Sequence, residues 1–185
     1  MDGTSGSNSY KLIDELFKKS NELMIISPFI SKNYAYTLLH YSQSKKIRII
    51  LSNSKSNIAA LEILNTKKSS YGGIKLFLFI LILLSVSIIL NFNVISFFLL
   101  IILIMLLVYI INKRISNKNN LSIKVPKGKF VHEKLYIGNN YAIAGSANLT
   151  YSGMHKNIEY MKIISDQNEL KGLKEHFNSL WYMFN

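Results

Sequence analysis

A histidine and a lysine separated by one residue, His132 and Lys134, are the residues of this chain best suited to covalent chemistry. Alternate residues of a strand point to the same side of a sheet, so the two side chains would lie together if this segment is extended. Shortly afterwards Ser146 and Asn148, within Gly-Ser-Ala-Asn, bring a hydroxyl and an amide to the end of a second expected strand. A nitrogen nucleophile, a fixed cation and neutral donors suit a phosphate group. The pattern therefore indicates phosphate chemistry.

The elements that must position these residues follow from the hydrophobic periodicity. Strands alternate with helices in the first half of the chain, which favours a largely parallel or mixed sheet and an α/β fold. Asp166 followed by Glu169 is typical of a capping box that opens a last helix. We expect helices at residues 10–21, 33–42, 57–65 and 167–184, and strands at 23–27, 47–51, 122–125, 130–137, 141–145 and 158–164.

Composition divides the chain into parts. Its 185 residues suffice for about one domain, and they combine 49% hydrophobic residues with a formal net charge of +12. Residues 76 to 112 contain no Asp, Glu, Lys or Arg, so the whole charge lies on the two flanks. The absence of cysteine excludes disulfides, thiolate metal sites and cysteine nucleophiles. Residues 1–9 are small and polar, which predicts a flexible tail without a cleavable signal.

The uncharged stretch predicts a transmembrane hairpin at 74–112. A polar turn at 91–93 separates two apolar runs, which gives spans of about 74–90 and 94–111, because one straight helix would be far too long for a bilayer. Lysines and an arginine flank the stretch, and the turn carries no charge, so the positive-inside rule predicts a two-pass membrane protein with both terminal parts in the cytoplasm. Residues 10–70 and 113–185 then form two parts of one domain. The alternative is one buried core helix and a strand.

The ordered set of motifs resembles the phospholipase D superfamily. His132-Glu-Lys-Leu-Tyr-Ile, followed by Gly145-Ser-Ala-Asn-Leu-Thr-Tyr-Ser-Gly153, is similar to the branch that carries a single His-x-Lys motif. The resemblance covers nearly all of the chain outside the uncharged stretch and the first few residues. It implies a phospholipase D-like mixed sheet flanked by helices, and a phosphodiesterase that needs no metal or cofactor.

The resemblance also implies roles for individual residues. His132 would attack phosphorus and form a phosphohistidine. Lys134, Ser146 and Asn148 would hold the phosphate oxygens, with Lys134 and Asn148 stabilising the transition state. Glu159 would orient the histidine and fix its tautomer.

Two further motif positions are structural in this reading. Gly145 closes the second strand, and Asn139 stands where the family has an aspartate. If that carboxylate is mainly structural, asparagine can replace it. If its charge supports the lysine or the partner subunit, activity falls.

The family chemistry uses two histidines, one as nucleophile and one as general acid, whereas this chain has one copy of the motif. The remaining histidines lack the x-Lys context and are expected to be structural or at the surface: His40, His155 and His176. A complete site therefore predicts a two-fold homodimer, in which each chain gives one His132.

The sequence thus favours a membrane-anchored phosphodiesterase that hydrolyses a phosphodiester, with membrane phospholipid as the preferred substrate. One alternative is an endonuclease of the same family that acts on DNA or RNA, since a strong positive charge suits a polyanion. Another is a catalytically inactive membrane scaffold.

Overall fold

A computed structural model describes residues 3–6, 9–65 and 120–184, together with residues 98, 102–103, 105–107 and 109–110. The chain divides into two compact units, Met1–Thr66 with Asn119–Asn185 and Lys67–Lys118. All of the strands and helices named below belong to the first unit, so this unit is built from both ends of the sequence.

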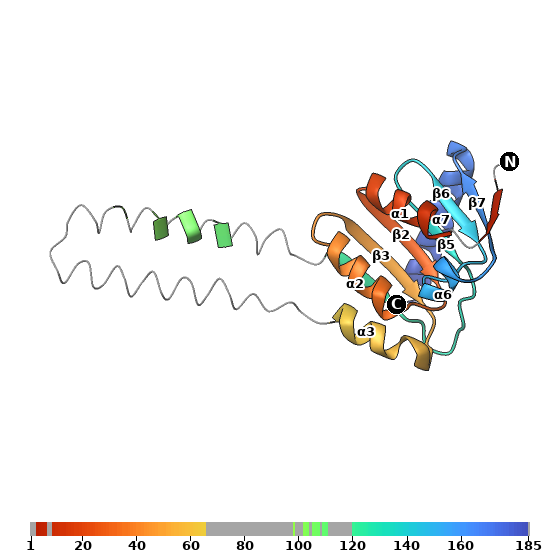
Figure 1. The fold of residues 1–185 in the computed structure, drawn as a ribbon, viewed down its shortest axis with the longest axis horizontal. Helices are drawn as coiled ribbons and strands as arrows, with labels where there is room; N and C mark the ends of the chain where they lie inside the picture. The colour runs from red at the N-terminus through yellow and green to blue at the C-terminus, as the bar shows by residue number, and fades with distance from the viewer. Residues whose placement is uncertain are drawn as a thin grey trace. The chain divides into compact units, whose positions relative to one another are not determined.

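A seven-stranded mixed sheet forms the centre of this unit, in the order β1-β7-β6-β5-β2-β3-β4 (Figure 1). Strands β2, β3 and β4 are parallel, whereas β5, β6, β7 and β1 pair antiparallel in succession from β2 outward. The strands are β1 Gly3–Gly6, β2 Glu22–Ser27, β3 Lys46–Leu51, β4 Leu121–Lys124, β5 Leu135–Ile137, β6 Ala142–Gly145 and β7 Glu159–Ile164. The mixed sheet predicted from the sequence is confirmed.

Helices cover both faces of the sheet. Alternation along β2 divides the core, because Leu23 and Ile25 belong to one buried cluster and Met24 and Ile26 to the other. The first cluster packs under α1 Ser9–Lys19, α2 Lys32–Tyr41, α3 Ile58–Asn65 and α6 Tyr151–His155, and the second under α7 Gln167–Met183. A short 3-10 turn, η1 Lys55–Asn57, leads into α3.

Local capping explains where α7 begins. The Asp166 carboxylate accepts hydrogen bonds from the backbone N–H groups of Asn168 and Glu169, at 3.0 and 2.9 Å. These are two of the donors that a helix leaves unpaired in its first turn. Glu169 pairs with Lys162 at 3.2 Å. The predicted start of this helix is therefore confirmed.

Two predictions differ from the structure. The strand expected at 130–137 begins only at Leu135, because the backbone N–H and C=O of Val131 are both bonded to the Ser52 hydroxyl rather than to a neighbouring strand. The tail expected to be flexible at 1–9 includes β1, which pairs with β7 through its backbone. Backbone pairing of that kind requires no hydrophobic pattern, and so the sequence gives no signal for it.

The hairpin predicted at 74–112 falls almost entirely outside the described residues. Within the part of the chain that the structure describes, no helix is both long enough and apolar enough to cross a bilayer. A span needs about 20 successive apolar helical residues, whereas α7, the longest described helix, has 17 residues with charges along it. On this finding the predicted localisation, a two-pass membrane protein with cytoplasmic ends, is wrong.

Candidate active site

One edge of the sheet gathers the residues singled out in the sequence, with the exception of Asn139. It is formed by the carboxyl ends of β2, β3 and β6 and the amino ends of β5 and β7, and we call it the site edge. In Figure 1, β2 and β3 point toward α6 at this edge. The loops here are joined by a bridge between Ile30 and Leu149, which brings the first and second halves of the chain together.

His132 and Lys134 lie side by side just before β5. The Lys134 ammonium donates to Nε2 of His132 at 2.9 Å and to the backbone carbonyl of His132 at 2.8 Å. An ammonium group has only donors, so Nε2 must accept, and the neutral ring carries its proton on Nδ1. The lone pair on Nε2 therefore faces the lysine. His132 is exposed and Lys134 is half-buried, so a ligand can reach this pair.

Two opposing effects act on the Lys134 ammonium. Burial lowers the pKa of Lys134 below its ordinary value of 10.5, and the negative charge of Glu159 partly offsets this effect by raising the pKa. The charge of Glu159 therefore opposes the effect of burial on the protonation of Lys134.

Ser146 and Glu159 form a second group. The Ser146 hydroxyl donates to the Glu159 carboxylate and accepts from the backbone N–H of Tyr160 at 3.0 Å. The other carboxylate oxygen of Glu159 accepts from the Asn157 amide at 3.1 Å, and Glu159 is buried. Among the described residues Glu159 thus contacts Ser146 and Asn157. Its predicted role as the residue that orients His132 stays a prediction.

Asn148 has unused hydrogen-bonding capacity. Its side-chain oxygen is buried and has no partner among the described residues. Buried polar groups in proteins are nearly always paired, and the exceptions gather at functional sites. Rotation of the amide would present its N–H₂ instead, as a donor suited to a phosphate oxygen.

Buried side chains from the first half of the chain hold the site loops in place. The Ser52 hydroxyl donates to the Val131 carbonyl at 2.6 Å and accepts from the Val131 N–H at 3.0 Å, directly beside His132. The Ser27 hydroxyl accepts from the Leu149 N–H at 2.9 Å, next to Asn148.

Two further buried contacts hold the same loops. The Asn57 amide bonds the backbone of Pro28, Ile30 and Ser52. The Tyr136 hydroxyl donates to the Ala147 carbonyl at 2.8 Å. Sequence reasoning missed these positioning residues. The available signal was that Ser27 and Ser52 each follow a run of buried apolar strand residues.

Gly145 permits a close approach of two strands. A Cβ atom at this position would lie 2.0 Å from the Tyr160 carbonyl oxygen and 2.7 Å from the Met161 sulfur. Only glycine allows β6 to reach β7 there, so Gly145 fixes the path that leads into Ser146.

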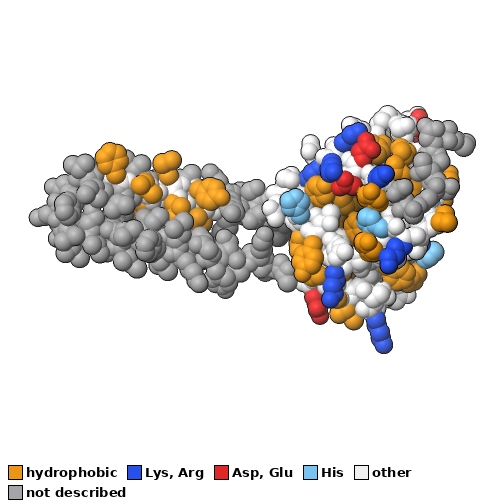
Figure 2. Space-filling view, in the orientation of Figure 1, with side chains coloured by type: hydrophobic (Ala, Val, Ile, Leu, Met, Phe, Trp, Pro, Cys, Tyr) orange, Lys and Arg blue, Asp and Glu red, His pale blue; other side chains and the backbone are white. Residues whose placement is uncertain are grey.

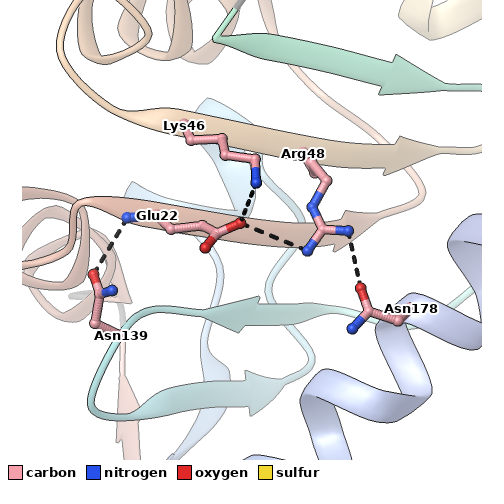
Figure 3. Close-up of polar contacts among 5 residues, drawn as sticks. All are labelled: Glu22, Lys46, Arg48, Asn139 and Asn178. Carbon is pink, nitrogen blue, oxygen red and sulfur yellow. Dashed lines mark hydrogen bonds and ion pairs between the residues drawn. The ribbon is translucent and has the colours of Figure 1, made fainter.

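Asn139 lies at the opposite end of β5 from His132. Its side-chain oxygen accepts from the backbone N–H groups of Asn21 and Glu22, at 2.6 and 3.2 Å, where β2 begins (Figure 3). Figure 3 also shows Glu22 between Lys46 and Arg48 on the neighbouring strand. Both contacts of Asn139 need only an oxygen acceptor. An amide oxygen therefore serves here as well as a carboxylate.

The other histidines have different surroundings. His155 stacks against Tyr10 and Tyr151, with ring centroids 4.5 and 4.8 Å apart. His176 bonds the Glu133 carboxylate at 2.8 Å from the α7 side of the sheet. His40 is exposed on α2.

The described residues bring together no three His, Asp or Glu side chains that could hold a metal ion. At the site edge they place an imidazole nitrogen and an ammonium in the segment before β5, and a hydroxyl and an amide in the loop after β6. These are groups able to bind and attack a phosphate.

The comparisons agree with this chemistry. A family model described as "Cardiolipin synthase, PLD-like domain" matches residues 12–181. No curated protein sequence matched the chain.

Solved structures share the fold. Nuc from Salmonella typhimurium, a phospholipase D family member, aligns with a TM-score of 0.59 at 12% identity over 98% of this chain and 94% of its own. NucT from Helicobacter pylori has a TM-score of 0.52 at 12% identity over 98% and 94%. Phosphatidylserine synthase from Haemophilus influenzae Rd KW20 has a TM-score of 0.54 at 12% identity, over 99% of this chain and 38% of that protein.

The family match spans most of the chain and includes both halves of the sheet, the His132–Lys134 pair and the loop after β6. The chain therefore belongs to the phospholipase D superfamily, as a PLD-like domain.

Proposed function

We propose that the chain is a metal-independent phosphodiesterase in which His132 is the nucleophile. The observation that carries the proposal is the 2.9 Å contact between Lys134 Nζ and His132 Nε2. It directs the lone pair of the ring toward a cation, and a phosphate that enters between them meets the nucleophile and the charge together. Phosphate oxygens then replace the ring nitrogen as the acceptors of the lysine protons.

The reaction has two steps. The lone pair on Nε2 of His132 attacks phosphorus, the P–N bond forms, and the bond from phosphorus to the leaving oxygen breaks. The leaving oxygen takes a proton from a general acid. Water then attacks phosphorus and gives its proton to the same group that acted as acid, and the P–N bond breaks. The products are a phosphomonoester and an alcohol, and every protein group returns to its starting state.

We assign the general acid to the partner subunit's His132 in a two-fold homodimer. The chain has one His-x-Lys motif; His155 stacks on Tyr10 and His176 bonds Glu133, and neither is hydrogen-bonded to a described lysine as His132 is. A two-fold axis beside the site edge supplies a second imidazole from an identical chain, and it is the simplest closed arrangement.

Lys134, Ser146 and Asn148 are the proposed phosphate ligands. In the structure the Ser146 hydroxyl donates to Glu159, and the charge of Glu159 acts on Lys134. We propose that Glu159 is a positioning residue, which holds the single hydroxyl proton of Ser146 until a phosphate binds and the hydroxyl turns to it, and which helps Lys134 to stay protonated. In this proposal Glu159 orients His132 only after the dimer has formed and the substrate has bound.

The substrate class that we propose is broader than the one predicted from the sequence. The preference for a membrane phospholipid depended on the anchor, and that support is gone. The proposal here is hydrolysis of a phosphodiester, by a fold that is shared with Nuc, NucT and a phosphatidylserine synthase.

The test uses the full-length chain with bis(p-nitrophenyl) phosphate in excess EDTA. We expect release of p-nitrophenol to persist, and His132→Asn to lower it by about 100-fold or more, the scale of a lost nucleophile or proton-transfer group. Intact-mass spectrometry after an alkaline quench should show the phosphoryl adduct in the wild type and not in His132→Asn. His40→Asn, at an exposed position on α2, is the matched control. Equal turnover by His132→Asn would refute the assignment.

Mixing wild type with His132→Asn tests the shared site. If each site needs one histidine from each chain, an equal mixture that has exchanged subunits retains about one quarter of the activity, because only wild-type pairs work. Independent sites would retain about half, and this result would rule out a shared site.

A further inference from the structure

Two neighbouring phenylalanine rings lie next to the proposed nucleophile. The Phe130 ring stacks on His132, with centroids 6.0 Å apart and planes 29° apart. The Phe29 ring lies 5.9 Å from the Phe130 ring at a 55° tilt. Phe29 comes from the loop after β2 and Phe130 from the segment before β5, so the site edge itself brings the rings together.

The Phe130 side chain is exposed although its backbone is held in place. It is 57% exposed, although the Ser52–Val131 contact fixes the backbone directly beside it. Burial of a phenylalanine ring ordinarily stabilises a fold, and a single exposed ring is common. This one differs because it is held in contact with the candidate nucleophile.

The loops that surround this ring are strongly basic. Residues 28–32, 52–57, 125–134 and 145–158 contain a single acidic residue, Glu133, and it is paired with His176. The lysines of these loops, Lys134 apart, are all exposed: Lys32, Lys55, Lys127, Lys129 and Lys156. On the face that Figure 2 shows, basic and hydrophobic side chains are likewise interspersed over this unit. The site edge therefore carries much of the net charge.

A chain of phosphates fits this distribution better than a lipid does. A lipid head group offers one phosphodiester, and its acyl chains need a continuous apolar surface. Here lysines alternate with other residues along 127–129 and stand on several separate loops. Aromatic rings beside a basic groove are the means by which proteins bind single strands, because every base has a face that can stack.

We propose that the site edge binds single-stranded nucleic acid, with one base stacked on Phe130 beside the scissile phosphate and flanking phosphates on the lysines. This inference rests on the proposed function for its cleavage step and not for its binding step. Phe130 is then the residue that selects a base-carrying strand.

Binding is the measurement, since it does not require turnover. Fluorescence anisotropy of the full-length chain, kept in solution with mild detergent, would give dissociation constants for a labelled mixed-sequence DNA 12-mer. An abasic strand of the same length keeps the phosphates and removes the bases. Phe130→Ala should weaken binding of the normal strand by about 5- to 150-fold, the range for one stacked base, and leave the abasic strand unchanged. Phe130→Trp should keep the affinity.

Controls separate stacking from charge. Tyr36→Ala removes a ring of similar exposure, 62%, on α2 and should leave both constants unchanged. Lys127→Gln combined with Lys129→Gln should weaken both strands alike. The slope of log affinity against log salt should become shallower by about 1.4, which is about 0.7 for each lost phosphate contact on a single strand.

Three outcomes would overturn the inference. Phe130→Ala could weaken both strands equally, or neither. Light scattering could instead show that the wild type is a dimer and Phe130→Ala a monomer, which would make Phe130 an interface residue. The wild type could bind phosphatidylglycerol vesicles and hydrolyse them through His132 while it ignores the 12-mer, and the proposed phosphodiesterase function would then survive with a lipid substrate. If the strand binds as predicted but no diester is cleaved, the proposed function fails and this inference stands.

Discussion

Replacement of Ser52 by alanine should destabilise the domain and disable the site together. The Ser52 side chain is fully buried, and one hydroxyl satisfies both backbone groups of Val131, at 2.6 and 3.0 Å. Ser52→Ala leaves a buried N–H and a buried C=O unpaired, at about 1–3 kcal/mol for each. We therefore expect the free energy of unfolding to fall by about 2–6 kcal/mol, a large share of the total for an ordinary domain.

Urea unfolding followed by tryptophan fluorescence measures this loss. With a slope of about 1–3 kcal/mol per molar urea, the midpoint should fall by roughly 1–2 M. Because Val131 precedes His132, hydrolysis of the small diester should also fall, under conditions in which the variant remains folded. Ser54→Ala is the matched control, since its hydroxyl bonds only within a local turn near the surface, to the Ser56 hydroxyl at 2.8 Å and to the Ser56 backbone N–H at 3.3 Å. A midpoint for Ser52→Ala equal to that of Ser54→Ala would refute the reasoning.

Three further variants test other parts of the site. Asn139→Asp keeps an oxygen acceptor for both backbone contacts, so stability in urea and diester turnover should match the wild type, whereas Asn139→Ala should lose about 0.5–1.5 kcal/mol, since both contacts are exposed. Burial lowers the pKa of Lys134, so kcat/KM should show a second decline that begins below pH 10.5 as the ammonium loses its proton, above the pH at which the general-acid histidine is deprotonated, and Lys134→Arg, which stays charged, should remove this second decline even if its rate is lower. Tyr136→Phe leaves the buried Ala147 carbonyl unpaired and should cost about 1–3 kcal/mol, measured by the same urea titration. An unchanged stability for Asn139→Ala or Tyr136→Phe, or an unchanged second decline for Lys134→Arg, would contradict these assignments.

Hydrophobic periodicity was sufficient to predict most of the sheet. The runs at 23–27 and 47–51 became β2 and β3 with ends displaced by one residue, and the helix predicted at 167–184 became α7. These elements obey a local rule, since one or both of their faces must be apolar. The motif residues were predictable for another reason: a phosphate needs a particular set of groups, and the sequence holds them close together.

The contacts that position the motif were not predictable, because they join residues far apart in the chain. Ser52 bonds Val131 across 79 positions, and Ser27 bonds Leu149 across 122. The apolar run before each serine places it at the end of a buried strand, but no local pattern tells which distant backbone group its hydroxyl will bond. For the same reason the segment at 130–134 was taken for a strand, although its backbone groups bond a side chain.

The topology of the sheet places the candidate site at one edge and the return of the chain at Asn120 at the opposite edge. Because β3 and β4 are parallel and Ile47 pairs with Leu121, the chain re-enters the sheet at Asn120 beside the start of β3, at the edge opposite Ser52 and His132. Asn139 and its partners at the start of β2 lie at that same remote edge. The family's aspartate position therefore belongs to the structural edge, where an amide oxygen is sufficient, and its replacement by asparagine gives no reason to regard the site as inactive. The residues that we propose to carry the reaction lie at the site edge, and there the chain has His132, Lys134, Ser146 and Asn148 of the motif.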